Sequence, residues 1–248
     1  MTTEIASHRG GALLWAENSR LAFENTAKLP VEQVEFDVHP SRDGKLVVIH
    51  DDTLERTTDG RGAVCQHDWA DLNRLILKDS GGQRMLLLEE VIEIFRPTPI
   101  VLRLEMKAGP GRVSYPDHPA RIVAALKANR VLDRTVMTSF QLGAAAEVSQ
   151  HGKPMRHVWL VTPATQVDIG LAGVLDLARA NAIPMLGLRA NMLDAPTVAA
   201  VRQAGFGIGG WACNDAVAIA KMFELEVDVF TTDRPDLALA LRAAREVA

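Results

Sequence analysis

Short apolar segments of β-like composition alternate along this chain with longer segments of helical period, and this alternation constrains the fold more than any other feature. The β-like segments are residues 5–7, 34–38, 46–49, 100–104, 136–139, 157–161, 185–188, 207–211 and 229–232. The helical period covers residues 20–28, 87–95, 119–129, 141–150, 171–180, 195–204, 216–223 and 236–245. Repeated strand-helix units of this kind predict a parallel sheet.

The number of these units matches one closed barrel. The chain has 248 residues, of which 48% are hydrophobic, and a barrel of eight strand-helix units takes about 250 residues. We therefore predict an α/β fold, a TIM (β/α)8 barrel, as a single domain over residues 1–248. The turn-rich segment 51–82, with only a weak helical stretch at 69–77, predicts a small insertion after the second or third strand.

Charge and composition restrict the class of partner. The formal net charge is −4 and the Lys and Arg residues are dispersed, which argues against nucleic acid as a partner because backbone neutralisation needs a basic surface. No apolar run approaches the roughly 20 residues that cross a bilayer, and no cationic, then apolar segment opens the chain. Only two cysteines occur, Cys65 and Cys213, without a CxxC pattern. These features predict a cytoplasmic protein without stable membrane insertion that binds small molecules.

Three carboxylates fall at the downstream ends of predicted strands. Glu35 and Asp37 are two apart, so their side chains share a strand face, and Glu105 ends another strand. The carboxyl ends of the strands in a parallel barrel meet at one face, so these groups can converge there. An all-oxygen set of ligands favours a hard ion, Mg²⁺ or Ca²⁺, over zinc. Surface acids or ion-pair partners are the alternative interpretation of such a pair.

Histidines and cations at other strand ends extend this candidate site. His8 and His50 can exchange protons near neutral pH, because an imidazole has an unperturbed pKa of about 6.5. Arg9 and Lys107 could hold phosphate oxygens, or neutralise the carboxylates, or do both. The remaining histidines are interpreted as solvated or locally hydrogen-bonded rings: His39, His67, His118, His151 and His157.

Ordered motifs over almost the whole chain resemble the glycerophosphodiester phosphodiesterases. They are Ser7-His8-Arg9-Gly10, Glu17-Asn18-Ser19, Glu35-Phe36-Asp37-Val38, residues 43–51, residues 54–62, Leu104-Glu105-Met106-Lys107, Ser139-Phe140, Trp211-Ala212-Cys213-Asn214 and Thr232-Asp233-Arg234-Pro235. Two departures from the family pattern occur: Ala16-Glu17-Asn18-Ser19 stands where the family has Pro-Glu-Asn-Thr, and Ser41 stands where it has Thr. Neither removes a group with an expected catalytic role.

The resemblance implies a barrel with an inserted segment after the His50 strand and a role for each candidate residue. It implies His8 and His50 as the acid–base pair, and Glu35, Asp37 and Glu105 as ligands of a divalent metal, Mg²⁺ or Ca²⁺. Arg9 and Lys107 correspond to phosphate contacts. Phe140 and Trp211 correspond to walls of the substrate pocket, although plain core packing is an equal explanation of Phe140. The implied reaction converts a glycerophosphodiester to glycerol 3-phosphate and an alcohol.

Three other functions remain open at this stage. A related barrel enzyme, such as a lysophospholipase D, would use similar groups and differ in loops such as 107–118. A Schiff-base aldolase would use Lys107 as a nucleophile, and a non-catalytic barrel would only bind. The sequence leaves open the head group, the metal, the division of roles between the histidines and the oligomeric state.

Overall fold

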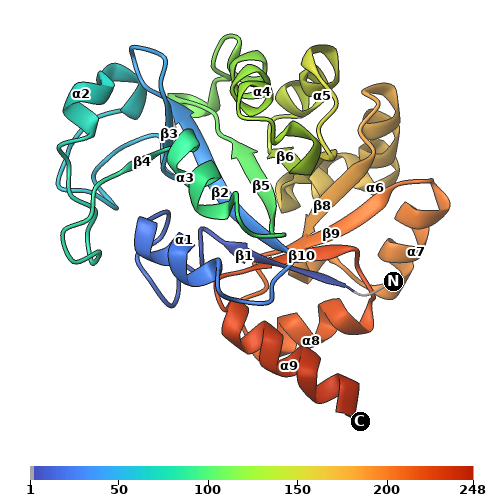
Figure 1. The fold of residues 1–248 in the computed structure, drawn as a ribbon. Helices are drawn as coiled ribbons and strands as arrows, with labels where there is room; N and C mark the ends of the chain where they lie inside the picture. Colours follow the sequence, from blue (N-terminus) through green and yellow to red (C-terminus); the bar gives the residue numbers. More distant parts are fainter. Residues whose placement is uncertain (1–2, 248) are drawn as a thin grey trace.

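Eight parallel strands close into a barrel in the computed structural model, which describes residues 3–247 (Figure 1). Their order around the barrel is β1, β2, β5, β6, β7, β8, β9 and β10, and β10 pairs with β1 to close it. The bounds are β1 Glu4–His8, β2 Gln33–Pro40, β5 Val101–Met106, β6 Thr135–Ser139, β7 Arg156–Val161, β8 Met185–Arg189, β9 Gly207–Trp211 and β10 Val229–Thr232. The predicted TIM barrel is confirmed. The prediction of one domain also includes Met1, Thr2 and Ala248, which lie outside the described residues.

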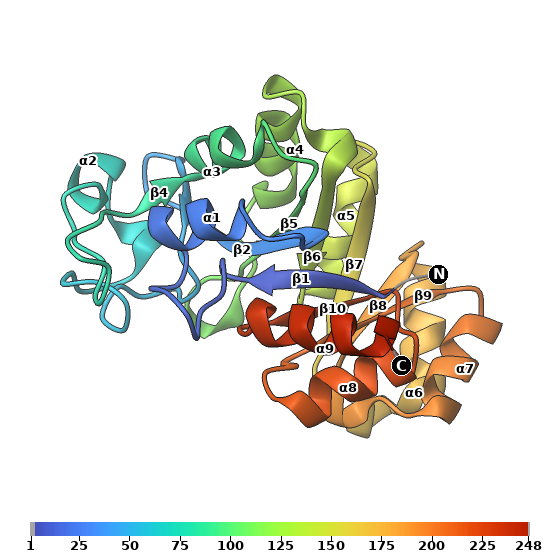
Figure 2. The same cartoon turned by 60° about the horizontal axis from the view of Figure 1, so that its bottom comes forward.

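Helices cover the outside of the barrel (Figures 1 and 2). Their bounds are α1 Arg20–Thr26, α3 Leu88–Phe95, α4 His118–Ala128, α5 Leu142–His151, α6 Pro163–Ala180, α7 Ala195–Gln203, α8 Ala216–Glu224 and α9 Pro235–Val247. The helix α6 begins eight residues earlier than the periodicity predicts. Two helical segments meet there at Gly170, whose φ of +67° kinks the chain, and the kink breaks the periodicity that would have marked one helix.

The strand predicted at residues 46–49 does not belong to the barrel, which corrects its assignment to a parallel unit. The strand β3 (Leu46–Val48) pairs antiparallel with the end of β2, in the register Val38↔Val48 and Pro40↔Leu46. The short strand β4 (Leu86–Leu87) pairs antiparallel with β3. The chain therefore leaves the barrel along β2, turns, and comes back along β3. Apolar periodicity gives a strand but not its direction, so the sequence could not exclude this course.

Residues 41–87 form an excursion from the barrel with its own small core. It contains the short helices η1 (Val64–Gln66) and α2 (Trp69–Leu72), and the segment predicted as an insertion, 51–82, lies within it. Three of its buried apolar residues, Leu46, Val48 and Leu86, join the main core. Seven others form a separate cluster: Val47, Ile49, Leu54, Val64, Leu72, Leu77 and Met85. Figure 2 shows the excursion beside the end of the barrel to which the arrow of β1 points. It therefore stands next to the carboxyl ends of the strands, where barrel enzymes keep their sites.

Two further apolar clusters fill the barrel wall and its interior. The larger one joins outward-facing strand residues such as Ile5, Phe36 and Leu104 to the helices. The smaller one takes the alternate strand positions, which point inward: Ala6, Val136, Val158, Leu160, Met185 and Val229. Among the residues described, no helix combines the length and apolarity that a bilayer crossing requires.

Candidate active site

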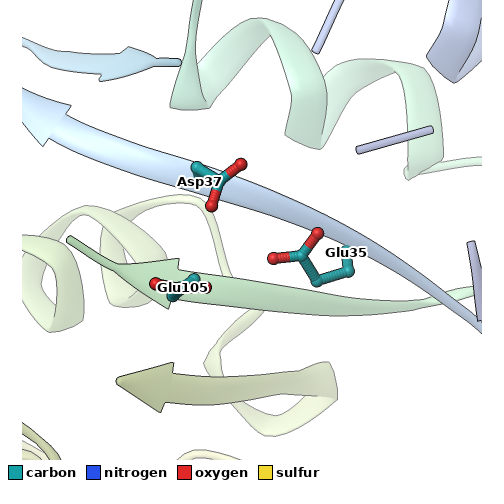
Figure 3. A group of neighbouring side chains, drawn as sticks. All are labelled: Glu35, Asp37 and Glu105. Atoms are coloured by element: carbon teal, nitrogen blue, oxygen red, sulfur yellow. The ribbon is translucent and has the colours of Figure 1, made fainter. Parts of the chain in front are cut away.

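Three buried carboxylates lie together at the mouth of the barrel. Glu35 and Asp37 extend from β2 and Glu105 from the adjacent β5 (Figure 3). The parallel register sets Asp37 directly opposite Glu105, and each of the three residues offers an oxygen within 4.8 Å of the others. The strand ladder thus converts the i, i+2 spacing into one compact acidic cluster, as the sequence predicts.

Two basic side chains form ion pairs with this acidic cluster. Lys107 Nζ lies 2.8 Å from Glu105 Oε1 and 3.4 Å from Asp37 Oδ1, and Arg9 Nε lies 3.4 Å from Asp37 Oδ2. Burial opposes ionisation of Asp37, but Lys107, His50 and Arg9 outweigh it and lower its pKa. Burial and the neighbouring Asp37 raise the pKa of Glu35 to about 7, which indicates too little positive charge near that carboxyl.

A divalent cation fits this donor set. The buried Oδ1 of Asp37 accepts no hydrogen bond from the described residues, although buried carboxylate oxygens normally have partners. Three carboxylate oxygens with one such vacant acceptor suit a hard cation such as Mg²⁺ or Ca²⁺. The acid cluster of Glu35, Asp37 and Glu105 is therefore the part of the described chain that could hold a metal.

His8 ends β1 beside the acidic cluster and is held by a carboxylate on each side. Its Nδ1 lies 2.5 Å from Asp233 Oδ1, and its Nε2 lies 3.7 Å from Glu35 Oε2. Asn214 fixes Asp233 in turn, because its Oδ1 accepts the Asp233 backbone N–H and its Nδ2 donates to Asp233 Oδ2. Burial lowers the pKa of His8, but Glu35 and Asp233 more than compensate, so the net shift is upward.

His50 reaches the same mouth from the excursion. Because the chain returns along β3, the Ile49 backbone N–H donates a hydrogen bond to the Asp37 carbonyl at 3.1 Å. His50 Nδ1 lies 2.6 Å from Asp51 Oδ1, and Arg56 holds Asp51 through its Nε at 2.6 Å. The Arg56 hydrogen bond contributes most to lowering the pKa of Asp51 to about 2. Each imidazole is therefore oriented at Nδ1 by a carboxylate, and Nε2 is the ring nitrogen that this contact leaves available.

The loop after β1 joins these groups. Arg9 has φ +50° and is followed by Gly10 at φ +76°, and a Cβ on Gly10 would lie 2.8 Å from the Ala22 Cβ. Only glycine fits there, because the backbone is left-handed and packs closely on α1. The turn directs the Arg9 backbone N–H to Glu35 Oε2 at 3.1 Å and its Nη1 to Glu17 Oε1 at 3.1 Å.

Two cavities adjoin the acidic cluster, and His50, Glu105 and Phe140 line both of them. One, of about 280 Å³, lies along the β5–α4 loop and includes Arg112. The other, of about 220 Å³, extends into the barrel and includes His8 and Trp211. Phe140 and Trp211 meet edge to face with centroids 5.3 Å apart, and the indole Nε1 donates to the Gly187 carbonyl at 3.3 Å. Both aromatic residues therefore form cavity wall.

Comparison with known proteins agrees with this arrangement. The pattern of the Glycerophosphoryl diester phosphodiesterase family matches residues 8–237. The chain belongs to this family. A crystal structure from Agrobacterium tumefaciens, assigned as a glycerophosphoryl diester phosphodiesterase, is 35% identical, covers 100% of both chains and superposes with a TM-score of 0.97.

Other relatives cover nearly the full chain at lower identity. The glycerophosphodiester phosphodiesterase of Bacillus altitudinis is 29% identical over 97% of this chain and 98% of its own. An Oleispira antarctica phosphodiesterase, solved in complex with the product sn-glycerol-3-phosphate, shares 23% identity and the fold, with a TM-score of 0.78 over 96% of both chains. The resemblance to glycerophosphodiester phosphodiesterases and the membership of an enzyme family are thus confirmed.

All nine residues selected from the sequence border this mouth, but the residues that orient them were missed. Asp233, Asn214, Asp51, Arg56 and Glu17 carry no signal of their own, because each is a common polar residue in a loop. Their only sequence signal is their position inside the motifs of the glycerophosphodiester phosphodiesterase family. Geometry alone shows which imidazole each carboxylate holds.

The other histidines all form hydrogen bonds within the protein. The prediction of solvated or locally bonded rings is wrong for two of them, which are buried and bond to distant parts of the chain. His39 Nε2 donates to the His50 carbonyl at 3.1 Å, and its Nδ1 lies 2.9 Å from the Tyr115 hydroxyl. His118 Nε2 donates to the Val38 carbonyl at 3.1 Å. Burial lowers the pKa of each of these rings to about 4. They therefore support the site as neutral structural groups.

Proposed function

We propose that this protein hydrolyses glycerophosphodiesters to glycerol 3-phosphate and an alcohol in a metal-dependent reaction. The observation that carries the proposal is the acidic cluster between two imidazoles, each oriented by its own carboxylate, beside two small cavities. Acids, bases and a candidate cation site within one mouth match the needs of phosphodiester cleavage. The relatives are named for glycerophosphodiesters, and we assign the same class of substrate to these cavities.

The divalent ion, Mg²⁺ or Ca²⁺, is assigned to Glu35, Asp37 and Glu105. When bound, it supplies positive charge where negative charge grows on the phosphoryl oxygens. Lys107 and Arg9 fix the carboxylate positions through their ion pairs. They are also the side-chain cations nearest to a phosphate at this cluster, so we assign both to phosphate contact.

We assign acid–base chemistry to His8 and His50. One imidazole takes the proton of the glycerol hydroxyl next to the phosphodiester, and the oxygen of that hydroxyl attacks phosphorus. The other imidazole gives a proton to the departing alcohol, which leaves a cyclic phosphate. Water then opens the ring at phosphorus, with the two imidazoles in exchanged protonation states, and yields glycerol 3-phosphate. Phe140 and Trp211 form the walls against which the substrate packs.

A Schiff-base role for Lys107 is disfavoured. A nucleophilic lysine must lose its proton, whereas Glu105 and Asp37 raise the pKa of Lys107 against the opposing effect of burial. A cytoplasmic location stays a prediction from the sequence, which makes no prediction of the head group.

Hydrolysis of glycerophosphocholine by the purified protein tests the proposal. We expect release of choline and glycerol 3-phosphate, loss of turnover with a chelator, and recovery with Mg²⁺ or Ca²⁺. Glu105→Gln keeps the shape of one ligand and removes its charge, so it should not recover with either ion. Unchanged turnover in the chelator would contradict metal dependence, and a protein inert towards a panel of glycerophosphodiesters with every ion would favour a binding module.

A further inference from the structure

Another cavity opens at the end of the barrel opposite the acidic cluster. It has a volume of about 590 Å³ and is lined by residues at the amino ends of the strands, among them Gln33, Val136, Arg156, Met185 and Val229. Arg103, from the middle of β5, lines this cavity and also the 220 Å³ cavity of the mouth. We call the larger one the amino-end cavity.

Arg103 is a buried charge that the proposed reaction does not use. It is 3% exposed, and no carboxylate of the described residues lies within ion-pair distance of it. Of its five N–H groups, one hydrogen bond is seen within residues 3–247, from Nη1 to Gln33 Oε1 at 3.2 Å. None of its nitrogens is among the fully buried, unpartnered polar atoms of that range, so the other N–H groups have surface in a cavity.

Arg156 provides a second guanidinium at the rim of the amino-end cavity. It is exposed, and its Nη1 has only a 3.6 Å contact with the Met185 sulfur in the described part of the chain. A buried arginine at the floor and an exposed one at the rim give a site with an entry path. Guanidinium groups present planar donor pairs that match the oxygens of a phosphate group.

In residues 3–247, no carboxylate that lines the amino-end cavity is within ion-pair distance of Arg103 or Arg156. Glu4 Oε2 accepts from Gln33 Nε2 at 2.5 Å. Asp228 Oδ2 accepts the Ile208 backbone N–H at 2.9 Å, and its Oδ1 faces Arg202 Nη2 at 3.5 Å. Glu226 is exposed at the outer rim. A buried charge without an ion-pair partner is costly, so an anion in the cavity would stabilise Arg103.

We propose that the amino-end cavity binds a small phosphate-type anion, held by Arg103 at its floor and Arg156 at its rim. Its volume admits a phosphate monoester as well as inorganic phosphate, so these are two sources of the same chemistry. The amino-end cavity shares Arg103 with the mouth, but the proposal does not depend on the proposed hydrolysis.

Equilibrium dialysis of the metal-free full-length protein against inorganic phosphate tests this site, with glycerol 3-phosphate as a second arm. We expect saturable binding that weakens about tenfold or more in Arg156→Gln and is lost in Arg103→Met, whose fold is checked by circular dichroism. Lys153→Gln is the matched control, because it removes an exposed positive charge from the segment that leads into β7 without lining the cavity. It should bind as the wild type does.

Two further outcomes would overturn the amino-end site. The first is wild-type affinity in Arg156→Gln. Because Arg156 is exposed, this variant tests the site even if Arg103→Met fails to fold. The second is binding that disappears in Arg9→Gln, which would place the phosphate in the mouth. Tighter binding of glycerol 3-phosphate than of inorganic phosphate would identify a monoester as the ligand, and equal binding would identify the free anion.

Discussion

The barrel and the excursion hold the two imidazoles of the site in different ways. His8 extends a barrel strand that is hydrogen-bonded to β2 and β10, so the ladder that aligns the carboxylates also aligns His8. His50 belongs to residues 41–87, whose small core is separate from that of the barrel. Its place at the mouth depends on the β2–β3 pairing, the bond from His39 to its carbonyl, and the Arg56–Glu17 ion pair. One half of the proposed acid–base pair is thus fixed by the main fold and the other by a smaller unit.

Removing either imidazole should have the largest effect. His8→Ala and His50→Ala should each reduce turnover by about 10²- to 10⁴-fold, because each deletes a proton donor or acceptor. Steady-state kinetics with glycerophosphocholine measures this, with circular dichroism as the check on folding. His151→Ala, in which the imidazole lost pairs with Glu147 on α5, should keep normal turnover. Near-normal turnover in both site variants would end the assignment.

Core truncations in the two regions should separate their stabilities. Leu104→Ala in the barrel and Leu72→Ala in the excursion each delete a fully buried leucine, which costs about 2–5 kcal/mol. We expect the first to lower the unfolding midpoint of the whole protein in urea. The second should mainly increase amide exchange within residues 41–87 and reduce turnover through His50. Exchange that rises equally in barrel and excursion in Leu72→Ala would show that the two regions unfold as one unit.

Replacing the orienting carboxylates should have a smaller effect. Asp233→Asn and Asp51→Asn keep the side-chain shape but remove the charged group that orients each imidazole, so we expect turnover to fall about 10- to 100-fold. The loss should be greater for Asp233, because its side chain is 16% exposed against 25% for Asp51 and water replaces it less well. KM should change little, since neither group is placed on the substrate. A larger loss of turnover in Asp51→Asn than in Asp233→Asn would show that the imidazole of the excursion depends more on its carboxylate than the imidazole of the barrel does.

The pH dependence of stability should give the smallest effect. Burial keeps His39 and His118 neutral, with pKa values lowered to about 4, whereas the unfolded chain protonates histidine near 6.5. Between these values the unfolded state binds more protons, so the free energy of unfolding should decrease as pH falls from about 6.5 to 4. At pH 5 we expect each ring to lower the free energy of unfolding by about 1–2 kcal/mol.

Urea titrations at several pH values measure this decrease. His118→Gln should flatten part of it, since its ring is bonded to the barrel strand β2. The part due to His39, which holds the His50 carbonyl, should accompany faster amide exchange in the excursion. Stability that is independent of pH between 6.5 and 4 in the wild type would contradict the neutral buried state of both rings.

The sequence predicts the barrel and the site far better than it predicts the excursion. Strand-helix alternation gives the barrel because each unit is local, and Glu35, Asp37 and Glu105 follow from the rule that parallel strands end at one face. The direction of β3 did not follow, because antiparallel pairing with β2 is a tertiary choice. His50 was placed correctly at the mouth through a wrong intermediate step, a parallel strand.

The orienting residues could not be derived from spacing either. Asp233 is 225 residues from His8, and only the closure of β10 onto β1 brings them together. The sequence could not predict the amino-end site either. It shows a charged residue, Arg103, in an apolar strand, but it does not show that this residue has no ion-pair partner. Contacts that depend on closure of the barrel are thus the part of the site that needs coordinates.

Anomalous diffraction from crystals soaked in Mn²⁺ tests the central claim most directly. The account predicts one ion bound by oxygens of Glu35, Asp37 and Glu105 at about 2.0–2.6 Å, between the imidazoles of His8 and His50. A protein that turns over substrate while its ion binds elsewhere, with those three carboxylates still paired only to Lys107 and Arg9, would contradict it.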